Sequence, residues 1–171
     1  MNFWRAADGP ELAQGDLLPR CVMPLFLPPE REIDDLLNLP LVQADLIVVT
    51  QSCDLENHNV QFVALCPIHT LEAFEEINPE FRRRGQWENV RKGRVEGLHL
   101  LGSPADPDNN RGALVVDFGH IVSLPFEYLA HHAQSLGDRW RLESPFLEHF
   151  SQAFARFFMR VGLPTAIPSY K

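Results

Sequence analysis

Apolar residues in this chain recur mostly in short runs separated by turn-forming residues, a pattern typical of β-strands. The run Asp45–Gln51 is rich in branched side chains, and Val60–Ile68 follows it after the polar stretch Asp54–Asn59. We therefore predict that these two runs pair as an antiparallel hairpin. Short strands with irregular connections favour a small, mostly antiparallel β barrel or a strongly bent sheet. The further predicted strands are Val22–Pro28, Leu98–Leu101, Ala113–Phe118, Ile121–Leu124 and Arg139–Leu142.

Apolar residues at steps of three and four predict one amphipathic helix near the C-terminal end, Ser144–Val161. Ser144 is a favourable N-cap, Pro145 suits the first helical position, and Gly162 is expected to end the helix. We expect the apolar face to pack across the β core, and a homodimer interface is the alternative. That face holds Phe146, Leu147, Phe150, Phe154, Phe157, Phe158 and Val161. The opposite face holds mainly Glu148, His149, Gln152, Arg156 and Arg160.

Three further helices are predicted, at Glu30–Leu37, at Leu71–Ile77 and from Pro79 to about Lys92, where Gly85 weakens the pattern. The last two would form a helical insertion over about 71–94, within a β core over about 15–142. The class is then α+β, with helices placed around a β core. A length of 171 residues fits one domain spanning 1–171.

The composition of the chain limits the cellular compartment and the cofactors that we expect. No apolar run approaches the roughly 18 residues of a membrane helix, and Met1–Pro10 lacks a signal-peptide core. We therefore expect a cytoplasmic protein that does not enter membranes. Three cysteines, an odd number, argue against a disulfide framework. No phosphate-binding loop or other cofactor motif is present, so no cofactor is expected.

The charge is unevenly distributed. The net charge is −8, which disfavours broad binding of phosphate groups. A basic cluster nevertheless surrounds one aromatic residue, and such a cluster could hold a nucleic-acid backbone and stack a base. The alternative is a solvated face that pairs with the acidic half of the chain. We predict only weak RNA binding by this cluster, which consists of Arg82, Arg83, Arg84, Trp87, Arg91, Lys92 and Arg94.

Cys53 is the candidate nucleophile, because it directly follows a buried strand at the mouth of a loop. A thiol becomes reactive only where a base or a positive field lowers its pKa. Of the nearby histidines, His99 is the best candidate base, and Asp117 could orient its imidazole. The alternative, which we favour, is that Cys53 and His99 are structural residues.

A zinc site is a weaker hypothesis. Cys53, His58, Cys66 and His69 offer four ligand types within seventeen residues. Strand alternation, however, places Cys66 on the same face as Val60, Phe62 and Ala64, toward an apolar core. We therefore predict no metal site.

Two resemblances add to these inferences. Gln14–Leu17 (Gln-Gly-Asp-Leu), Asp45–Gln51 and Val60–Thr70, which ends in Cys-Pro-Ile-His-Thr, resemble the opening of MazF/PemK-type toxins. This resemblance implies an SH3-like barrel. Val49–Leu55 and Gln152–Pro164 resemble an uncharacterised group of bacterial proteins.

The toxins are endoribonucleases that use an arginine in the first long loop and a serine or threonine after a Pro-Ile pair. By this resemblance Thr70 takes the second role, displaced one position by His69. The arginine position is occupied by Gln43-Ala-Asp45. We therefore expect a noncatalytic module that binds a protein partner, plausibly in a bacterial toxin–antitoxin or defence system. The alternatives are a toxin-like endoribonuclease using Thr70 and the basic cluster, and a thiol enzyme using Cys53.

Overall fold

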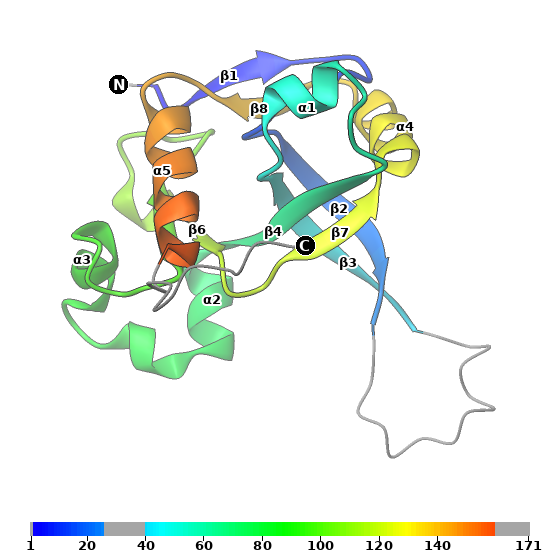
Figure 1. Ribbon diagram of the computed structural model, residues 1–171. Coiled ribbons are helices and arrows are strands. Elements are labelled where there is room, and N and C mark those ends of the chain that lie inside the picture. Colours follow the sequence, from blue (N-terminus) through cyan, green and yellow to red (C-terminus); the bar gives the residue numbers. More distant parts are fainter. Residues whose placement is uncertain (1, 26–39, 160–171) are drawn as a thin grey trace, which may run out of the picture.

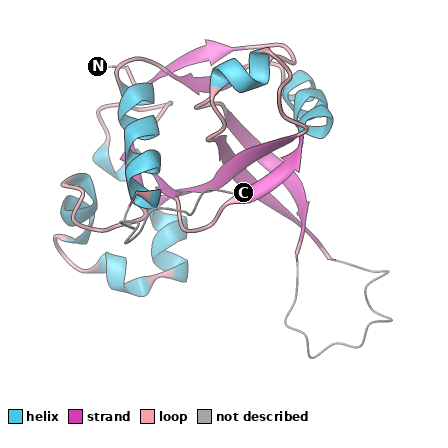
Figure 2. Ribbon diagram, in the orientation of Figure 1, coloured by secondary structure: helices cyan, strands magenta, loops and turns pink. Residues whose placement is uncertain are grey.

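The computed structural model describes residues 2–25 and 40–159. This part of the chain holds a six-stranded sheet, a two-stranded sheet and five α-helices, and all of its strand pairs are antiparallel. Figure 1 gives the order of the elements, and Figure 2 shows the strands at the centre with helices around them. The predicted α+β class is confirmed.

The central strand of the larger sheet is β4 (Phe62–Thr70). One edge of β4 pairs with β3 (Leu41–Val48), and β3 pairs in turn with β2 (Leu17–Pro24). The predicted hairpin of the two apolar runs is confirmed, with Leu46 opposite Pro67. The connection between β3 and β4, predicted as a polar loop, contains the short helix α1.

Two short strands share the other edge of β4. Its first half pairs with β7 (Val122–Pro125), and its second half pairs with β6 (Leu114–Asp117). The strand β5 (Leu98–Leu101) then pairs with β6 and ends the sheet. The sheet is thus long and bent around β4, as the irregular spacing of the predicted strands suggested.

The smaller sheet brings together two segments that are far apart in the sequence. It pairs β1 (Trp4–Ala7) with β8 (Arg139–Leu142). A single bridge between Asp16 and Arg141 connects it to the start of β2. Within residues 2–25 and 40–159 the strands do not close into a barrel, so the closed barrel that the sequence predicted is not observed.

Apolar side chains on the two faces of β4 belong to different clusters. Leu65 lies in a cluster covered by α4 (Phe126–Leu136), and Cys66 lies in a cluster covered by α5 (Phe146–Phe158). The ring of Phe150 from α5 is completely buried there. The predicted packing of the C-terminal aromatic face onto the β core is therefore confirmed.

The helical insertion is more broken than predicted. It consists of α2 (Leu71–Ile77), a 3₁₀ turn (Pro79–Arg82) and α3 (Gln86–Arg91). The sequence predicted one helix across the last two segments. Gly85 separates them because its φ of 89° lies in the left-handed region.

The ends of α5 also differ from the prediction. The helix begins at Phe146 with Pro145 at the N-cap position, and no side chain caps it, so Ser144 does not act as the N-cap. The predicted end at Val161 and Gly162 lies outside the described residues, as do the predicted helix Glu30–Leu37 and the last residues of the strand predicted from Val22.

Candidate functional site

A cleft of about 490 Å³ lies between α5 and the segment that runs from the end of α3 into β5. Figure 1 shows α3 and α5 as neighbouring helices on one side of the molecule. The volume is within the range of roughly 300–1,000 Å³ that ligand sites occupy. The cleft has an apolar floor that includes Leu98, Phe118 and Phe157 and a rim with several charged side chains.

One wall of the cleft is a polar stripe on α5. His149, Gln152 and Arg156 line it, and they recur at steps of three and four, so they lie above one another on one side of the helix. This stripe lies beside the apolar face that packs on the β core. Sequence analysis assigned these residues to the solvated face and missed their role as a cleft wall, although their spacing was the signal.

The opposite wall carries two residues of the predicted basic cluster. Arg91 and Lys92 line the cleft, and both contact Glu88, at 2.6 Å and 3.0 Å. Their hydrogen bonds lower the pKa of Glu88 to about 2. Glu88 therefore offsets one of these two positive charges, and Glu96, which also lines the cleft on this side, offsets the other.

Glycine allows the floor to approach α5 closely. Gly97 has a φ of 82°, and a Cβ atom at this position would lie 3.1 Å from the ring of Phe157. A larger residue would be strained in backbone and would displace the aromatic ring. The start of β5 and the C-terminal part of α5 can therefore enclose the cleft from two sides.

His99 lies on the β5 face that points toward α5. Its ring stacks on Phe118 and meets the edge of Phe150, with centroid distances of 5.9 Å for both. Burial lowers the pKa of His99 to about 4, and the charge of His149 adds to this lowering. The imidazole is therefore neutral at physiological pH. His99 is one of the residues that line the cleft, so part of its ring borders this space.

The predicted group of Cys53, His99 and Asp117 is not assembled in this cleft, whose lining includes His99 and neither of the others. Cys53 is exposed on α1 (Ser52–Glu56), and its Sγ lies 3.7 Å from the Gln51 side chain. Figure 1 shows α1 at the top of the molecule and α3 at the lower left.

Strand register also separates His99 from Asp117. His99 is paired with Val116, whereas Asp117 is paired with Leu98. Because neighbouring residues on a strand point to opposite faces, the two side chains are directed to opposite sides of the sheet. Asp117 instead accepts a hydrogen bond from the backbone N–H of Gly119 at 2.9 Å.

Thr70 has a local structural role. It is the N-cap of α2, and its hydroxyl oxygen accepts a hydrogen bond from the N–H of Ala73 at 3.1 Å. The position that the toxin resemblance assigned to catalysis thus stabilises the start of a helix.

Most of the predicted nucleic-acid cluster is exposed, including Arg82, Arg83, Arg84 and Arg94. Trp87 is an exception that the sequence did not reveal. Its ring contacts Phe74 and Phe81, and its indole N–H donates to Glu75 at 2.7 Å. The ring is therefore committed to the packing of the helical insertion and is not presented for stacking on a base.

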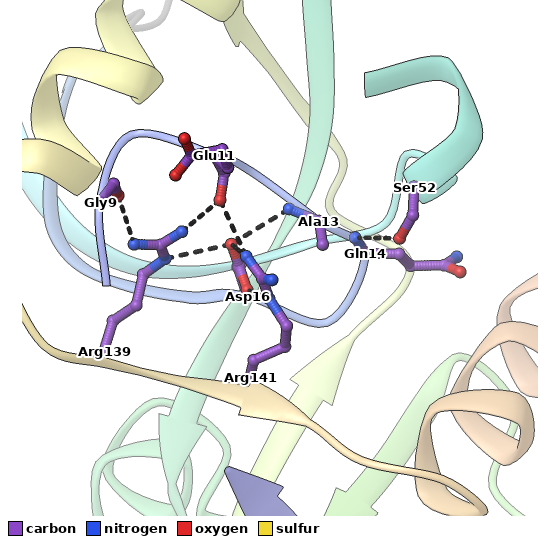
Figure 3. A network of polar contacts seen from close by, with 8 residues as sticks. All are labelled: Gly9, Glu11, Ala13, Gln14, Asp16, Ser52, Arg139 and Arg141. Carbon is purple, nitrogen blue, oxygen red and sulfur yellow. Dashed lines mark hydrogen bonds and ion pairs between the residues drawn. The ribbon is translucent and has the colours of Figure 1, made fainter. Parts of the chain in front are cut away.

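A second polar network is the most buried ionic feature of the described residues (Figure 3). The carboxylate of Asp16 contacts the guanidinium groups of Arg139 and Arg141, with Arg139 Nε at 3.1 Å. Both arginines also donate to the backbone carbonyl of Glu11, and Arg139 donates to that of Gly9 at 2.7 Å. All of these groups are satisfied internally, so the network fixes the N-terminal loop to β8.

Gln14 extends this network toward α1 and α5. Its backbone N–H donates to the Ser52 hydroxyl at 3.1 Å, and its amide nitrogen donates to the carbonyl of Val49 at 2.9 Å. Its amide oxygen accepts from Ser151 on α5 at 2.9 Å. The segment that precedes Cys53 is therefore held in place by structural bonds.

Metal binding finds no support among the described residues, which contain no group of three or more His, Cys, Asp or Glu side chains suited to a metal ion. Cys66 is buried, as strand alternation predicted, and so is Cys21. None of the helices in the described part is long and apolar enough to cross a membrane.

Comparisons with models of protein families, with curated proteins and with solved structures each find no match.

Proposed function

We propose that this protein is a noncatalytic binding module that recognises a partner protein through the cleft between α5 and β5. The observation that carries this proposal is the make-up of that cleft, which combines an apolar floor with cations on both walls and lacks a nucleophile. Apolar contact area with a few well-placed polar groups is what binding sites require. Catalysis would also require a nucleophile and a base within hydrogen-bond reach of each other.

The enzymatic alternatives have less support. A thiol enzyme needs a base beside Cys53, whereas the Cys53 sulfur contacts the neutral amide oxygen of Gln51. A toxin-like endoribonuclease needs the Thr70 hydroxyl, which is occupied in capping α2. Each candidate catalytic group is thus separated from the others or already engaged.

The scaffold and the setting are part of the proposal. A bent antiparallel sheet with a β1–β8 ribbon bridged to β2 is consistent with an SH3-like scaffold that is opened by its insertion. Together with the resemblance of Gln14–Leu17 and Val60–Thr70 to MazF/PemK-type toxins, this supports a role in a bacterial toxin–antitoxin or defence system. Three free cysteines fit a reducing cytoplasm.

The proposal is tested by selecting a random peptide library on the wild-type protein, with a second selection on the Lys92→Glu, Arg156→Glu double variant. A binding module should enrich a family of related peptides on the wild type and lose that family on the variant. The same preparation should leave labelled RNA intact. Steady cleavage of RNA, or enrichment of no peptide family, would overturn the proposal.

A further inference from the structure

We infer that the segment recognised by the cleft is an acidic peptide with one aromatic anchor, whose ring enters the apolar floor while flanking carboxylates bind the cations of both walls. This inference rests on the proposed function and assigns the chemistry of its ligand. It places the anchor against Leu98 and Phe157, and the carboxylates between Lys92 and Arg156.

The charge of the walls favours an anion. Arg91 and Lys92 line one wall and Arg156 lines the other, and these three cations exceed by one the two carboxylates beside them, Glu88 and Glu96. Cations that face one another across a cleft repel, and an anionic ligand between them relieves that repulsion. The whole chain carries a net charge of −8, so this positive region stands against an acidic background. Such local fields guide the approach of an oppositely charged partner.

The floor favours an aromatic side chain over a phosphate backbone. Phe118 is almost completely buried, and Leu98 and Phe157 are half-buried beside it. Phe118 already forms edge and tilted contacts with the rings of Phe154 and Phe157, at 5.4 Å and 6.4 Å. One more ring can extend such a cluster in the same geometry. A polyanion without an apolar group would make no apolar contact with this floor.

His99 contributes selectivity at the floor. Its ring lines the cleft, and because burial keeps its pKa at about 4 the ring is neutral. A neutral imidazole can exchange one hydrogen bond with the backbone of a bound peptide without placing a charge beside the anchor ring. The charged contacts are therefore confined to the rim and the apolar contacts to the floor.

The probe is a synthetic peptide of sequence Gly-Asp-Glu-Asp-Phe-Glu-Asp-Gly with an N-terminal fluorophore, titrated with the full-length protein by fluorescence anisotropy at low salt. Two matched peptides replace Phe by Ala, or all acidic residues by their amides. We expect each replacement to weaken binding about tenfold or more. Raising the salt concentration should weaken the acidic peptide and leave the amide peptide nearly unaffected.

Protein variants locate the site. Arg156→Glu and Lys92→Glu should each weaken the acidic peptide about fivefold to tenfold, because each reverses the charge of one wall. Arg5→Glu is the matched control. Arg5 is an exposed residue of β1 that does not line the cleft, so the same charge change there should alter the affinity less than twofold. Thermal unfolding of each variant, compared with the wild type, separates a lost contact from a lost fold.

The possible results decide between the two proposals. Equal binding of the amide peptide, or of the Arg156→Glu variant, would overturn the inferred chemistry. If the probe fails to bind while the library selection enriches a neutral or basic family, the inference is wrong and the binding function survives. RNA that displaces the probe at physiological salt would instead identify the ligand as nucleic acid.

Discussion

At the scale of single residues, the three cysteine side chains differ in their exposure to solvent. Cys53 is exposed, whereas burial raises the pKa of both Cys21 and Cys66 to about 12. Nearby carboxylates, Asp45 and Asp117 respectively, add to these increases. A thiol must be both accessible and deprotonated to react with an alkylating reagent.

We predict that iodoacetamide at pH 8 labels Cys53 at least about 100-fold faster than Cys21 or Cys66 in the folded protein, because the buried thiols react only after opening of the structure. Peptide mass spectrometry measures the three rates, and a urea-unfolded sample should label all three alike. Labelling of Cys53 that is equally fast at pH 6 would indicate an activated thiolate and contradict the noncatalytic proposal.

The buried carboxylate of Asp16 is the residue on which the polar network depends. Asp16 is fully buried, and the Arg139 side chain with which it pairs is only 1% exposed. We predict that Asp16→Asn destabilises the fold by about 3–5 kcal/mol, because it leaves two guanidinium groups without their shared counter-charge. Urea denaturation measures the loss, and exposed Asp138→Asn is the matched control. A loss below about 1 kcal/mol would show that the ion pairs matter little.

The neutral state of His99 makes stability depend on pH. Its pKa is about 4 in the folded protein and close to 6.5 when unfolded, so unfolding takes up a proton between these values. Stability is then complete above about pH 6.5 and falls as the pH decreases toward 4, by about 3 kcal/mol from this group. The His99→Gln variant lacks this titrating group. Between pH 6.5 and 4 its free energy of unfolding should therefore fall by about 3 kcal/mol less than that of the wild type. An unchanged pH dependence in the variant would contradict the burial of the ring.

At the scale of secondary-structure elements, local sequence patterns predicted several boundaries and missed others. The bounds predicted for α2, β5 and β8 match the structure, because turn residues and capping groups near each end act locally. The short strand β1 was missed, since Arg5 interrupts its pattern and its only partner is β8 at the other end of the chain. The helix α4 was also missed, although Leu129 and Ala133 follow a helical spacing.

The cleft could be predicted only in part, because its walls come from segments that are far apart in the sequence. His99, Arg91 and Lys92 were identified from sequence as candidates, and all three line it. The contribution of His149 and Arg156 depends on how α5 lies across the sheet, which no local pattern specifies. The proposed grouping with Cys53 failed because distance along the chain gives no measure of distance in the fold.

Two phenylalanines on the apolar face of α5 should respond differently to truncation, because one is buried in the middle of the helix and the other is exposed near its end. Phe150 is completely buried in the apolar cluster, whereas Phe158 near the end of the helix is 52% exposed. We predict that Phe150→Ala costs about 3–5 kcal/mol of folding free energy, through lost burial and the cavity that remains. Phe158→Ala is the matched control and should cost less than about 1 kcal/mol. Similar losses for the two variants, measured by urea denaturation, would mean that α5 does not pack as described.

At the scale of the whole molecule, the charge distribution limits what the protein can bind. Residues from both ends of the chain meet at Asp16, and its charge is neutralised internally by Arg139 and Arg141. Six of the other basic residues lie exposed on the insertion, between Arg82 and Arg94. Their field must act against a net charge of −8. Binding by charge alone is therefore expected to be short-ranged and sensitive to salt.

We accordingly predict that RNA binds weakly through this insertion and without sequence preference. Arg91 and Lys92 share Glu88, and Trp87 is packed internally, so only two or three phosphates should be neutralised at once. The affinity for a single-stranded RNA should then fall roughly tenfold between 50 mM and 200 mM salt. Filter binding measures this slope for several RNA sequences.

Two charge-reversal variants show whether the contacts lie where we place them. Arg83→Glu with Arg84→Glu should remove most of the remaining RNA affinity, because it turns two exposed cations of the insertion into anions. Arg5→Glu, on a different face, should leave both the affinity and the slope nearly unchanged. Since neither Arg83 nor Arg84 lines the cleft, the acidic peptide should bind the double variant with little change. RNA binding that persists at 200 mM salt and discriminates between sequences would contradict this prediction and favour a nucleic-acid function over a protein-binding module.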